Sequence, residues 1–306
     1  EKHTKERKLV TMMITNDSGR RRFLSRFLLG MVFLSVFHLY PKQSLNRASA
    51  LTLSTAQAED QLPVTGAPVT GELTMFAAAS LTEPFTEIGK RVELSHPGLK
   101  VVYNFGGSQA LRTQLEQGAQ ADVFASADAV QMEQAKKSNV VQGESPVFVK
   151  NKLVAIVPKE NKANVTTFCD LGKPGLKLDL ANVNVPVGNY SRQAFSKANA
   201  ACGPDFEQRA LKNLVSEEEN VKQVVTKVQL GEVDAGIVYI SDVTPKVSAS
   251  VSAVAIPDAA NQIATYPIAV TKEVRNRAAA RVFIGFVLSA EGQAILKAHS
   301  FLPLKE

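Results

Sequence analysis

The segment Leu73–Glu83, which reads L-T-M-F-A-A-A-S-L-T-E, contains residues suited to binding an anion. Its apolar start predicts a strand and its alanines a tight turn. Ser80, with Glu83 three residues later, has the capping-box spacing of a helix start that Glu83 holds in place. Small residues let the backbone approach a ligand, and a helix start offers unpaired N–H groups with partial positive charge. The segment therefore predicts an anion-binding corner, with an ordinary helix cap as the alternative.

Four later segments have a similar character. Ser108 follows two glycines between a predicted strand and a predicted helix, so it can offer both a hydroxyl and an N–H group. A Pro-x-Gly turn leaves N–H groups near Val187 free to face a cleft, and the N–H of Val221 lies at the start of another helix, behind acidic residues 217–219 that complement its dipole. Tyr239 ends an apolar strand, and its phenol can donate to an anion. The alternatives are plain turns, helix caps and packing contacts.

The elements that position these segments alternate along the chain from Glu72 onward, as in an α/β protein with largely parallel sheets. We expect strands at Leu73–Ala77, Lys100–Phe105, Asp122–Ala125, Leu153–Val157, Lys177–Leu180, Ala235–Tyr239, Val251–Ile256 and Tyr266–Val270. We expect helices at Leu81–Ser95, Ser108–Gln117, Ala129–Lys137, Ser191–Ala200, Asp205–Asn213, Asn220–Leu230, Val274–Leu288 and Ala290–His299.

The number of alternating units predicts two lobes, because roughly 235 residues are many for one core. Lobe 1 comprises residues 72–150 and 266–306, and lobe 2 comprises residues 151–265. The chain would cross between the lobes twice, along Lys152–Val157 and Thr265–Val270. A small ligand would then lie between the lobes, where binding sites are common.

Three stretches are specific enough to indicate a family. They are F-A-A-A-S-L-T (Phe76–Thr82), G-A-Q-A-D-V-F-A-S-A-D (Gly118–Asp128) and G-I-V-Y-I-S-D (Gly236–Asp242), and Y-P-I-A-V (Tyr266–Val270) supports them. From about Glu72 to Pro303 the chain resembles the periplasmic molybdate-binding proteins of ABC importers. This resemblance implies a two-lobed type II periplasmic-binding-protein fold, α/β in class, with a central mixed sheet in each lobe and helices on both faces.

The resemblance also implies the ligand and its contacts. Molybdenum would be bound as molybdate, and tungstate would bind as well, through the hydroxyl and N–H groups of Ser80 and Ser108, the N–H groups of Val187 and Val221, and the phenol of Tyr239. The protein would be a monomer without a cofactor that delivers the anion to the membrane permease of an ABC importer. Two departures from the family pattern affect selectivity: Gly106-Gly107-Ser108 replaces a run of serines, and Val187 replaces a familiar alanine.

None of the five expected contacts is a lysine or an arginine. A rigid cage of N–H and O–H donors at helix starts still supplies partial positive charge and fixes the radius of the cavity. With donors and no carboxylate acceptor, the cage favours a fully deprotonated oxyanion over protonated phosphate. A binding protein for sulfate or another small tetrahedral oxyanion is the alternative within this class.

The basic charge of the chain belongs to its first 58 residues, which hold ten Lys and Arg against three Asp and Glu, whereas the rest holds 25 against 26. This distribution argues against nucleic-acid binding. Arginines 20–22 followed by the apolar run Phe27–Phe37 predict a signal peptide over residues 1–58, cleaved after Ala58 or after Ala50 and followed by a flexible tail over 59–71. An uncleaved membrane anchor is the alternative. We therefore expect a periplasmic protein.

Cys169 and Cys202 are expected to form a disulfide in that oxidising compartment, with two buried thiols as the alternative. An enzyme is disfavoured because the part after the leader contains two histidines, His96 and His299, and neither accompanies a nucleophile motif or a metal-ligand cluster. A transcription regulator with a similar effector-binding core is disfavoured because no helix-turn-helix pattern precedes the core.

Overall fold

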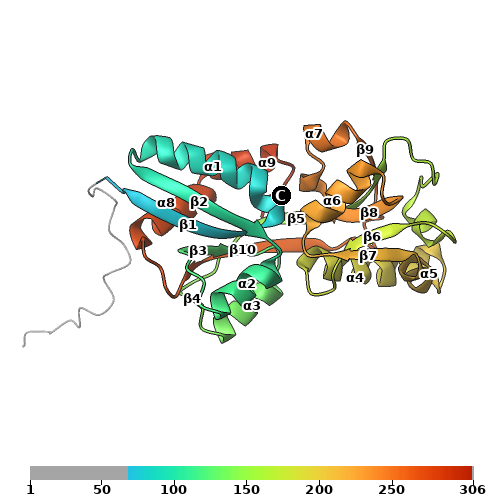
Figure 1. Ribbon diagram of the computed structural model, residues 1–306, viewed down its shortest axis with the longest axis horizontal. Helices are drawn as coiled ribbons and strands as arrows, with labels where there is room; N and C mark the ends of the chain where they lie inside the picture. The colour runs from blue at the N-terminus through green and yellow to red at the C-terminus, as the bar shows by residue number, and fades with distance from the viewer. Residues whose placement is uncertain (1–67, 305–306) are drawn as a thin grey trace, which may run out of the picture. The chain divides into compact units, whose positions relative to one another are not determined.

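The computed structural model describes residues 68–304 (Figure 1). The predicted signal peptide, residues 1–58, and residues 59–67 of the predicted tail lie outside the described residues. Each predicted strand and helix has a counterpart in the structure, with bounds that shift by a few residues. The strands are β1 (Gly71–Ala78), β2 (Leu99–Gly106), β3 (Val123–Ala125), β4 (Val141–Gln142), β5 (Val147–Pro158), β6 (Leu178–Ala181), β7 (Leu214–Glu218), β8 (Ala235–Tyr239), β9 (Val251–Val254) and β10 (Ile263–Thr271).

The strands are flanked by α-helices, and three short 3₁₀ turns also lie within the described residues. The helices are α1 (Thr82–Ser95), α2 (Ser108–Glu116), α3 (Ala129–Lys137), α4 (Pro186–Cys202), α5 (Phe206–Lys212), α6 (Val221–Leu230), α7 (Pro245–Ser248), α8 (Arg277–Leu288) and α9 (Ala290–Ala298). The 3₁₀ turns are η1 (Ala79–Leu81), η2 (Phe168–Gly172) and η3 (Ile240–Asp242).

The sheet has two halves. Along it the strands follow the order β2-β1-β3-β10-β5-β8-β6-β7, and we call β2-β1-β3-β10 the first half and β5-β8-β6-β7 the second. Pairing is parallel between β1 and its neighbours β2 and β3, and between β6 and its neighbours β7 and β8, whereas β5 and β10 pair antiparallel with each other and with the rest. The sheet is therefore mixed rather than largely parallel.

Strands β5 and β10 join the two halves (Figure 1). Their register pairs Ile263 with Lys152 and Tyr266 with Val149, next to the two crossings that the sequence predicts. The division of the chain into lobes at residues 150 and 266 stays a prediction.

Helices cover both faces of the first half because side chains of its strands alternate between two cores. Leu73 and Met75 of β1 contact the core that includes Phe85 and Phe283 from α1 and α8. Phe76 faces the other way, into a separate core with residues of α2 and α3. Accordingly, α1, α8 and α9 lie on one side of the sheet and α2 and α3 on the other (Figure 1). In residues 68–304 no single helix is long and apolar enough to span a membrane, although α8 and α9 pass that test as a pair bent by 65°.

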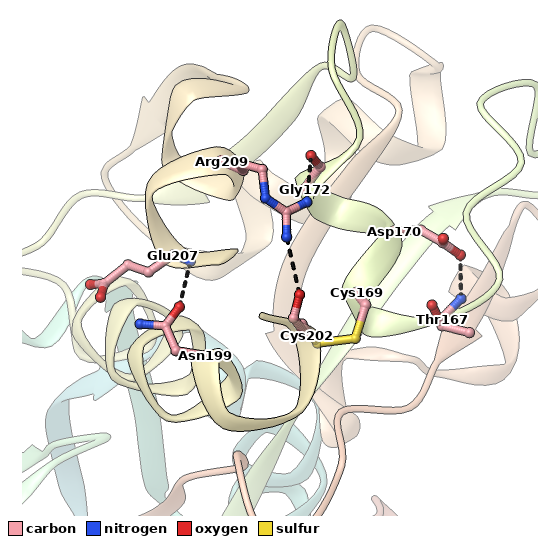
Figure 2. The surroundings of a disulfide bond; sticks show 8 residues. All are labelled: Thr167, Cys169, Asp170, Gly172, Asn199, Cys202, Glu207 and Arg209. Carbon is pink, nitrogen blue, oxygen red and sulfur yellow. Dashed lines mark hydrogen bonds between the residues drawn. A yellow bond between two sulfur atoms is a disulfide. The ribbon is translucent and has the colours of Figure 1, made fainter. Parts of the chain in front are cut away.

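A disulfide between Cys169 and Cys202 fastens η2 to the last residue of α4 (Figure 2). The guanidinium of Arg209, on α5, bridges the same region by donating to the carbonyls of Cys202 (3.0 Å) and Gly172 (3.3 Å). Beneath it, Phe168, Phe195 and Phe206 pack at ring distances of 5.5–5.8 Å. The far end of α4 is thus anchored in the core of the second half.

The acidic run Glu217–Glu219 is not the first helical turn that its sequence suggested. Glu217 and Glu218 belong to β7, an unpredicted edge strand whose residues alternate in exposure, and α6 has no acidic residue in its first turn. Their charges are paired elsewhere: Glu217 bonds Arg192, and Glu218 bonds Lys227. The side-chain amide oxygen of Asn220 caps α6 by accepting from the N–H groups of Lys222 and Gln223, so the helix begins at Val221.

The capping box expected at Ser80 and Glu83 is also absent. Ser80 lies in the 3₁₀ turn η1, α1 begins at Thr82, and neither element has a side-chain cap. Thr82 donates its hydroxyl back to the Ala79 carbonyl at 2.7 Å, which tightens the turn. Ser80 and Glu83 are thereby released for other partners, which are described below.

Candidate anion-binding site

The five residues expected to contact an anion all line one cavity, between η1 and α2 on one side and α4, α6 and β8 on the other. The cavity is small: its atom-free space is about 210 Å³ even when the solvent at its open mouth is included. Its lining residues are Ala78, Ala79, Ser80, Gly106, Gly107, Ser108, Ala127, Val185, Pro186, Val187, Asn220, Val221 and Tyr239. Most of these side chains are small, so the backbone lies at the cavity wall.

Three α-helices begin at this cavity: α2 after Gly107, α4 after Val185 and α6 after Asn220. The first N–H groups of a helix have no partner inside it and carry partial positive charge. No acidic residue occupies the first turn of any of the three, and Gly107 and Val185 provide no side-chain cap. The N–H groups at these starts therefore remain available to a ligand.

Helix α4 begins five residues before the predicted start at Ser191, because Pro186 takes its first position, where proline is well suited. This earlier start places Val187 in the first helical turn, where its N–H has no partner in the helix. Close packing fixes the turn: a Cβ atom on Gly188 would lie 2.1 Å from the carbonyl oxygen of Asn182. In α6, Asn220 caps Lys222 and Gln223 but leaves the N–H of Val221 uncapped.

The hydroxyl oxygen of Ser108 accepts a hydrogen bond from the protein backbone. The N–H of Ala127, in the loop between β3 and α3, donates to Ser108 Oγ at 3.0 Å. A serine hydroxyl has one proton, and here that proton is free to point into the cavity. Ala127 was not among the predicted site residues, although it lies in the motif Gly118–Asp128.

Tyr239 gives the clearest indication that this cavity binds a ligand. Its side chain is 1% exposed and its hydroxyl is buried without a hydrogen-bond partner among the described residues. Buried hydroxyls are nearly always paired, so an unpaired one at a cavity wall indicates that a ligand atom completes it. Burial raises the pKa of Tyr239 well above its ordinary value, so the phenol keeps its proton and acts as a donor.

Among residues 68–304, no lysine or arginine lines the cavity. Lys222, in the first turn of α6, is paired with two carboxylates. Its Nζ lies 2.8 Å from Glu83 Oε2 and 3.1 Å from Asp242 Oδ1. Burial alone would lower the pKa of Lys222, but Asp242 and Glu83 raise it above its ordinary value. The cavity itself therefore offers neutral donors only.

The Glu83–Lys222 pair also ties α1 to α6 across the site, so the role of Glu83 is an ion pair between elements rather than a helix cap. A second contact lies beside it: Gln109 Nε2 donates to the Glu219 carbonyl at 3.2 Å. Gly107 approaches the same carbonyl so closely that a Cβ atom there would lie 2.4 Å from its oxygen. The structure thus shows both walls of the cavity in contact.

Comparison with known proteins gives a consistent result. Residues 73–302 match the family described as bacterial extracellular solute-binding protein. The molybdate-binding protein ModA of Mycobacterium tuberculosis (strain H37Rv) is 38% identical over 229 residues, which cover 75% of this chain and 84% of that protein.

Two solved structures share the fold. The substrate-binding domain of a putative molybdenum ABC transporter from Clostridium difficile has a TM-score of 0.57 and 29% identity, covering 76% of this chain and 99% of that one. The sulfate-binding protein SubI of M. tuberculosis has a TM-score of 0.68 at 17% identity, covering 76% and 87%. The predicted two-lobed α/β fold class is confirmed, and the chain belongs to the family of bacterial extracellular solute-binding proteins.

Proposed function

We propose that this protein captures molybdate in the cavity between η1, α2, α4, α6 and β8. The observation that carries the proposal is the unpartnered hydroxyl of Tyr239 at a wall that also holds Ser80, Ser108, Val187 and Val221. Each of these residues presents a donor and none a formal charge. The names of the relatives from M. tuberculosis and C. difficile, both more than a quarter identical to this chain, support molybdenum as the element carried.

Donor-only chemistry explains why a tetrahedral dianion is the ligand. A fully deprotonated oxyanion accepts a hydrogen bond at every oxygen, so each donor in the cavity finds a partner. Hydrogen phosphate carries a proton that needs an acceptor, and a buried proton without one costs about 1–3 kcal/mol. Sulfate can accept from the same donors, but its bonds to the central atom are shorter and the anion is smaller. In a cavity of fixed radius its hydrogen bonds would be longer, so the cavity favours molybdate. We expect tungstate, close to molybdate in size and charge, to bind as well.

The wider role that we propose follows from the family. The protein would act outside the cytoplasm, in the periplasm, as a monomer that delivers molybdate to the membrane permease of an ABC importer. We propose no catalytic role and no cofactor: molybdate is the cargo.

The test is a calorimetric titration of the purified protein with molybdate, tungstate, sulfate and phosphate at pH 7.5. We expect molybdate and tungstate to bind at one site, with sulfate and phosphate weaker by a hundredfold or more. Sulfate binding as tightly as molybdate would replace the proposed ligand with the alternative, a general small-oxyanion carrier. Absence of heat with all four anions would refute the anion site itself.

A further inference from the structure

Two fully buried side chains, those of Tyr266 and Asn151, form a hydrogen-bonded row behind Ser80. Neither of them lines the cavity. Ser80 Oγ lies 2.9 Å from the hydroxyl of Tyr266, and Asn151 Nδ2 lies 3.3 Å from the same hydroxyl. Tyr266 and Asn151 are 0% exposed, and Ser80 is 2% exposed. Tyr266 is on β10 and Asn151 on β5, the two strands that join the halves of the sheet.

The amide group of Asn151 is held in one orientation. Its oxygen accepts from the N–H of Lys152 at 3.0 Å, and its nitrogen donates to Ser241 Oγ at 2.8 Å. The nitrogen therefore faces Ser241 and Tyr266. An amide nitrogen can only donate, so the Tyr266 oxygen must accept from Asn151.

This constraint fixes the direction of the next hydrogen bond. Within the described residues, the Tyr266 oxygen has two polar neighbours, Asn151 Nδ2 and Ser80 Oγ. Its own proton can be satisfied only by donation to Ser80 Oγ, because a buried O–H group without an acceptor is costly. Burial raises the pKa of Tyr266 above its ordinary value, so the proton is present. Ser80 then accepts on its protein side and turns its proton toward the cavity.

We propose that Asn151 and Tyr266 are positioning residues that make Ser80 a permanent hydrogen-bond donor to the bound oxyanion, and so exclude anions that carry a proton. This inference rests on the proposed function. The ring of Tyr266 is held in place by edge-to-face contacts with the rings of Phe148, Tyr239 and Phe301, at centroid distances of 6.3, 5.9 and 5.4 Å.

The hydroxyl of Ser108 is also left with its proton facing the cavity, but without a row of side chains, because the backbone N–H of Ala127 donates directly to its oxygen. The two serines therefore give a matched pair: the Ser80 hydroxyl depends on Tyr266, and the Ser108 hydroxyl does not. This difference makes the role of Tyr266 separable from a general effect on the fold.

The test is a double-mutant cycle on molybdate affinity. We expect Ser80→Ala to weaken binding by about 10- to 150-fold, and Tyr266→Phe by about three- to tenfold. If Tyr266 acts through the Ser80 hydroxyl, the double variant binds within twofold of Ser80→Ala alone. The matched control combines Tyr266→Phe with Ser108→Ala, and there the two factors should multiply. Multiplied factors in the Ser80 cycle as well would overturn the proposal.

A second variant reverses the direction of the hydrogen bonds along the row instead of removing one of them. In Asn151→Asp, a carboxylate accepts from Tyr266, Tyr266 accepts from Ser80, and Ser80 presents a lone pair to the cavity. At pH 8.5 we expect molybdate to bind at least tenfold more weakly and the preference for molybdate over hydrogen phosphate to fall by more than tenfold. An unchanged preference in a variant with native circular dichroism would also overturn the proposal.

These outcomes are distinct from failure of the proposed function. If the wild-type protein binds sulfate rather than molybdate, the same cycle is measured with sulfate and the row is tested unchanged. If the wild-type protein binds none of the four anions, the function and the row that rests on it are both refuted.

Discussion

Replacing Tyr239 by phenylalanine removes one oxygen atom from a position where the protein gives it no partner. That hydroxyl is buried without a hydrogen-bond partner among residues 68–304, which costs about 1–3 kcal/mol relative to a paired group. With the oxyanion bound, the same hydroxyl donates to a charged acceptor, a contact of about 1.5–3 kcal/mol. The substitution should therefore separate binding from stability.

The expected result is opposite in sign for the two quantities. Molybdate should bind Tyr239→Phe about 10- to 150-fold more weakly, because 1.4 kcal/mol corresponds to a factor of ten in the dissociation constant. The free energy of unfolding without ligand should stay the same or rise by up to about 1 kcal/mol, because no protein hydrogen bond is lost. Calorimetry measures the first quantity and urea unfolding the second.

Tyr103→Phe is the matched control. The Tyr103 hydroxyl donates to the Phe85 carbonyl at 2.6 Å and does not line the cavity. Its loss should lower the free energy of unfolding by about 1 kcal/mol and leave molybdate affinity within twofold. Wild-type molybdate affinity in Tyr239→Phe, or a loss of stability equal to that of Tyr103→Phe, would refute the role of the Tyr239 hydroxyl as a donor to the anion.

Four further predictions follow from single features of the structure. Ser108→Ala should weaken molybdate binding by tenfold or more, and an unchanged calorimetric affinity would count against the site. Gly107→Ala would place a Cβ atom 2.4 Å from the Glu219 carbonyl oxygen; it should lower the free energy of unfolding by about 1–3 kcal/mol and weaken molybdate binding, and a variant with wild-type stability in urea unfolding would contradict this. The double substitution Cys169→Ser and Cys202→Ser should lower the free energy of unfolding by about 3–4 kcal/mol with affinity within a few-fold, and an equal denaturation midpoint would contradict it. Asp179 is buried without hydrogen bonds to its oxygens, and burial followed by the nearby Glu218 raises its pKa from 3.8 to about 7. The folded state therefore holds this proton where the unfolded state has lost it, so the stability contributed by the group is full below about pH 4 and is lost as the pH rises through 7. Asp179→Asn should then be more stable than wild type by roughly 2–4 kcal/mol at pH 8 and by less at pH 5, and an equal difference at both pH values in urea unfolding would contradict it.

The five expected contact residues came from the family resemblance, and local patterns in the sequence supported several of them; that they contact an anion stays a prediction. Ser108 and Val221 could be placed at helix starts from neighbouring residues, whereas Val187 was expected in a turn before a helix at Ser191 and lies in the first turn of α4 instead. Predictions from local patterns were wrong where one pattern fits two structures, as at the expected capping box and in the acidic run before α6. Ser80 and Glu83 have capping-box spacing, but a 3₁₀ turn intervenes and Glu83 pairs with Lys222 instead. The acidic run before α6 forms part of an edge strand, where alternating exposure suits charged side chains as well as a helix start does.

What could not be predicted depends on contacts between distant residues. Tyr266 reaches Ser80 across 186 residues, and Lys222 reaches Glu83 across 139. Neither Tyr266 nor Asn151 carries a local sign of its partner, since a tyrosine or an asparagine in an apolar strand usually indicates packing or an edge. Only the strand order, which places β10 beside β5, brings Asn151 and Tyr266 together.

The most direct test of the account is the position of the metal itself. A crystal of the purified protein grown with molybdate would locate molybdenum by anomalous scattering at its absorption edge. We predict one peak per chain, in the cavity, with oxygens within hydrogen-bond distance of the Ser80, Ser108 and Tyr239 hydroxyls and the Val187 and Val221 N–H groups. A peak elsewhere, or a cavity that stays free of molybdenum at saturating molybdate, would contradict the central claim.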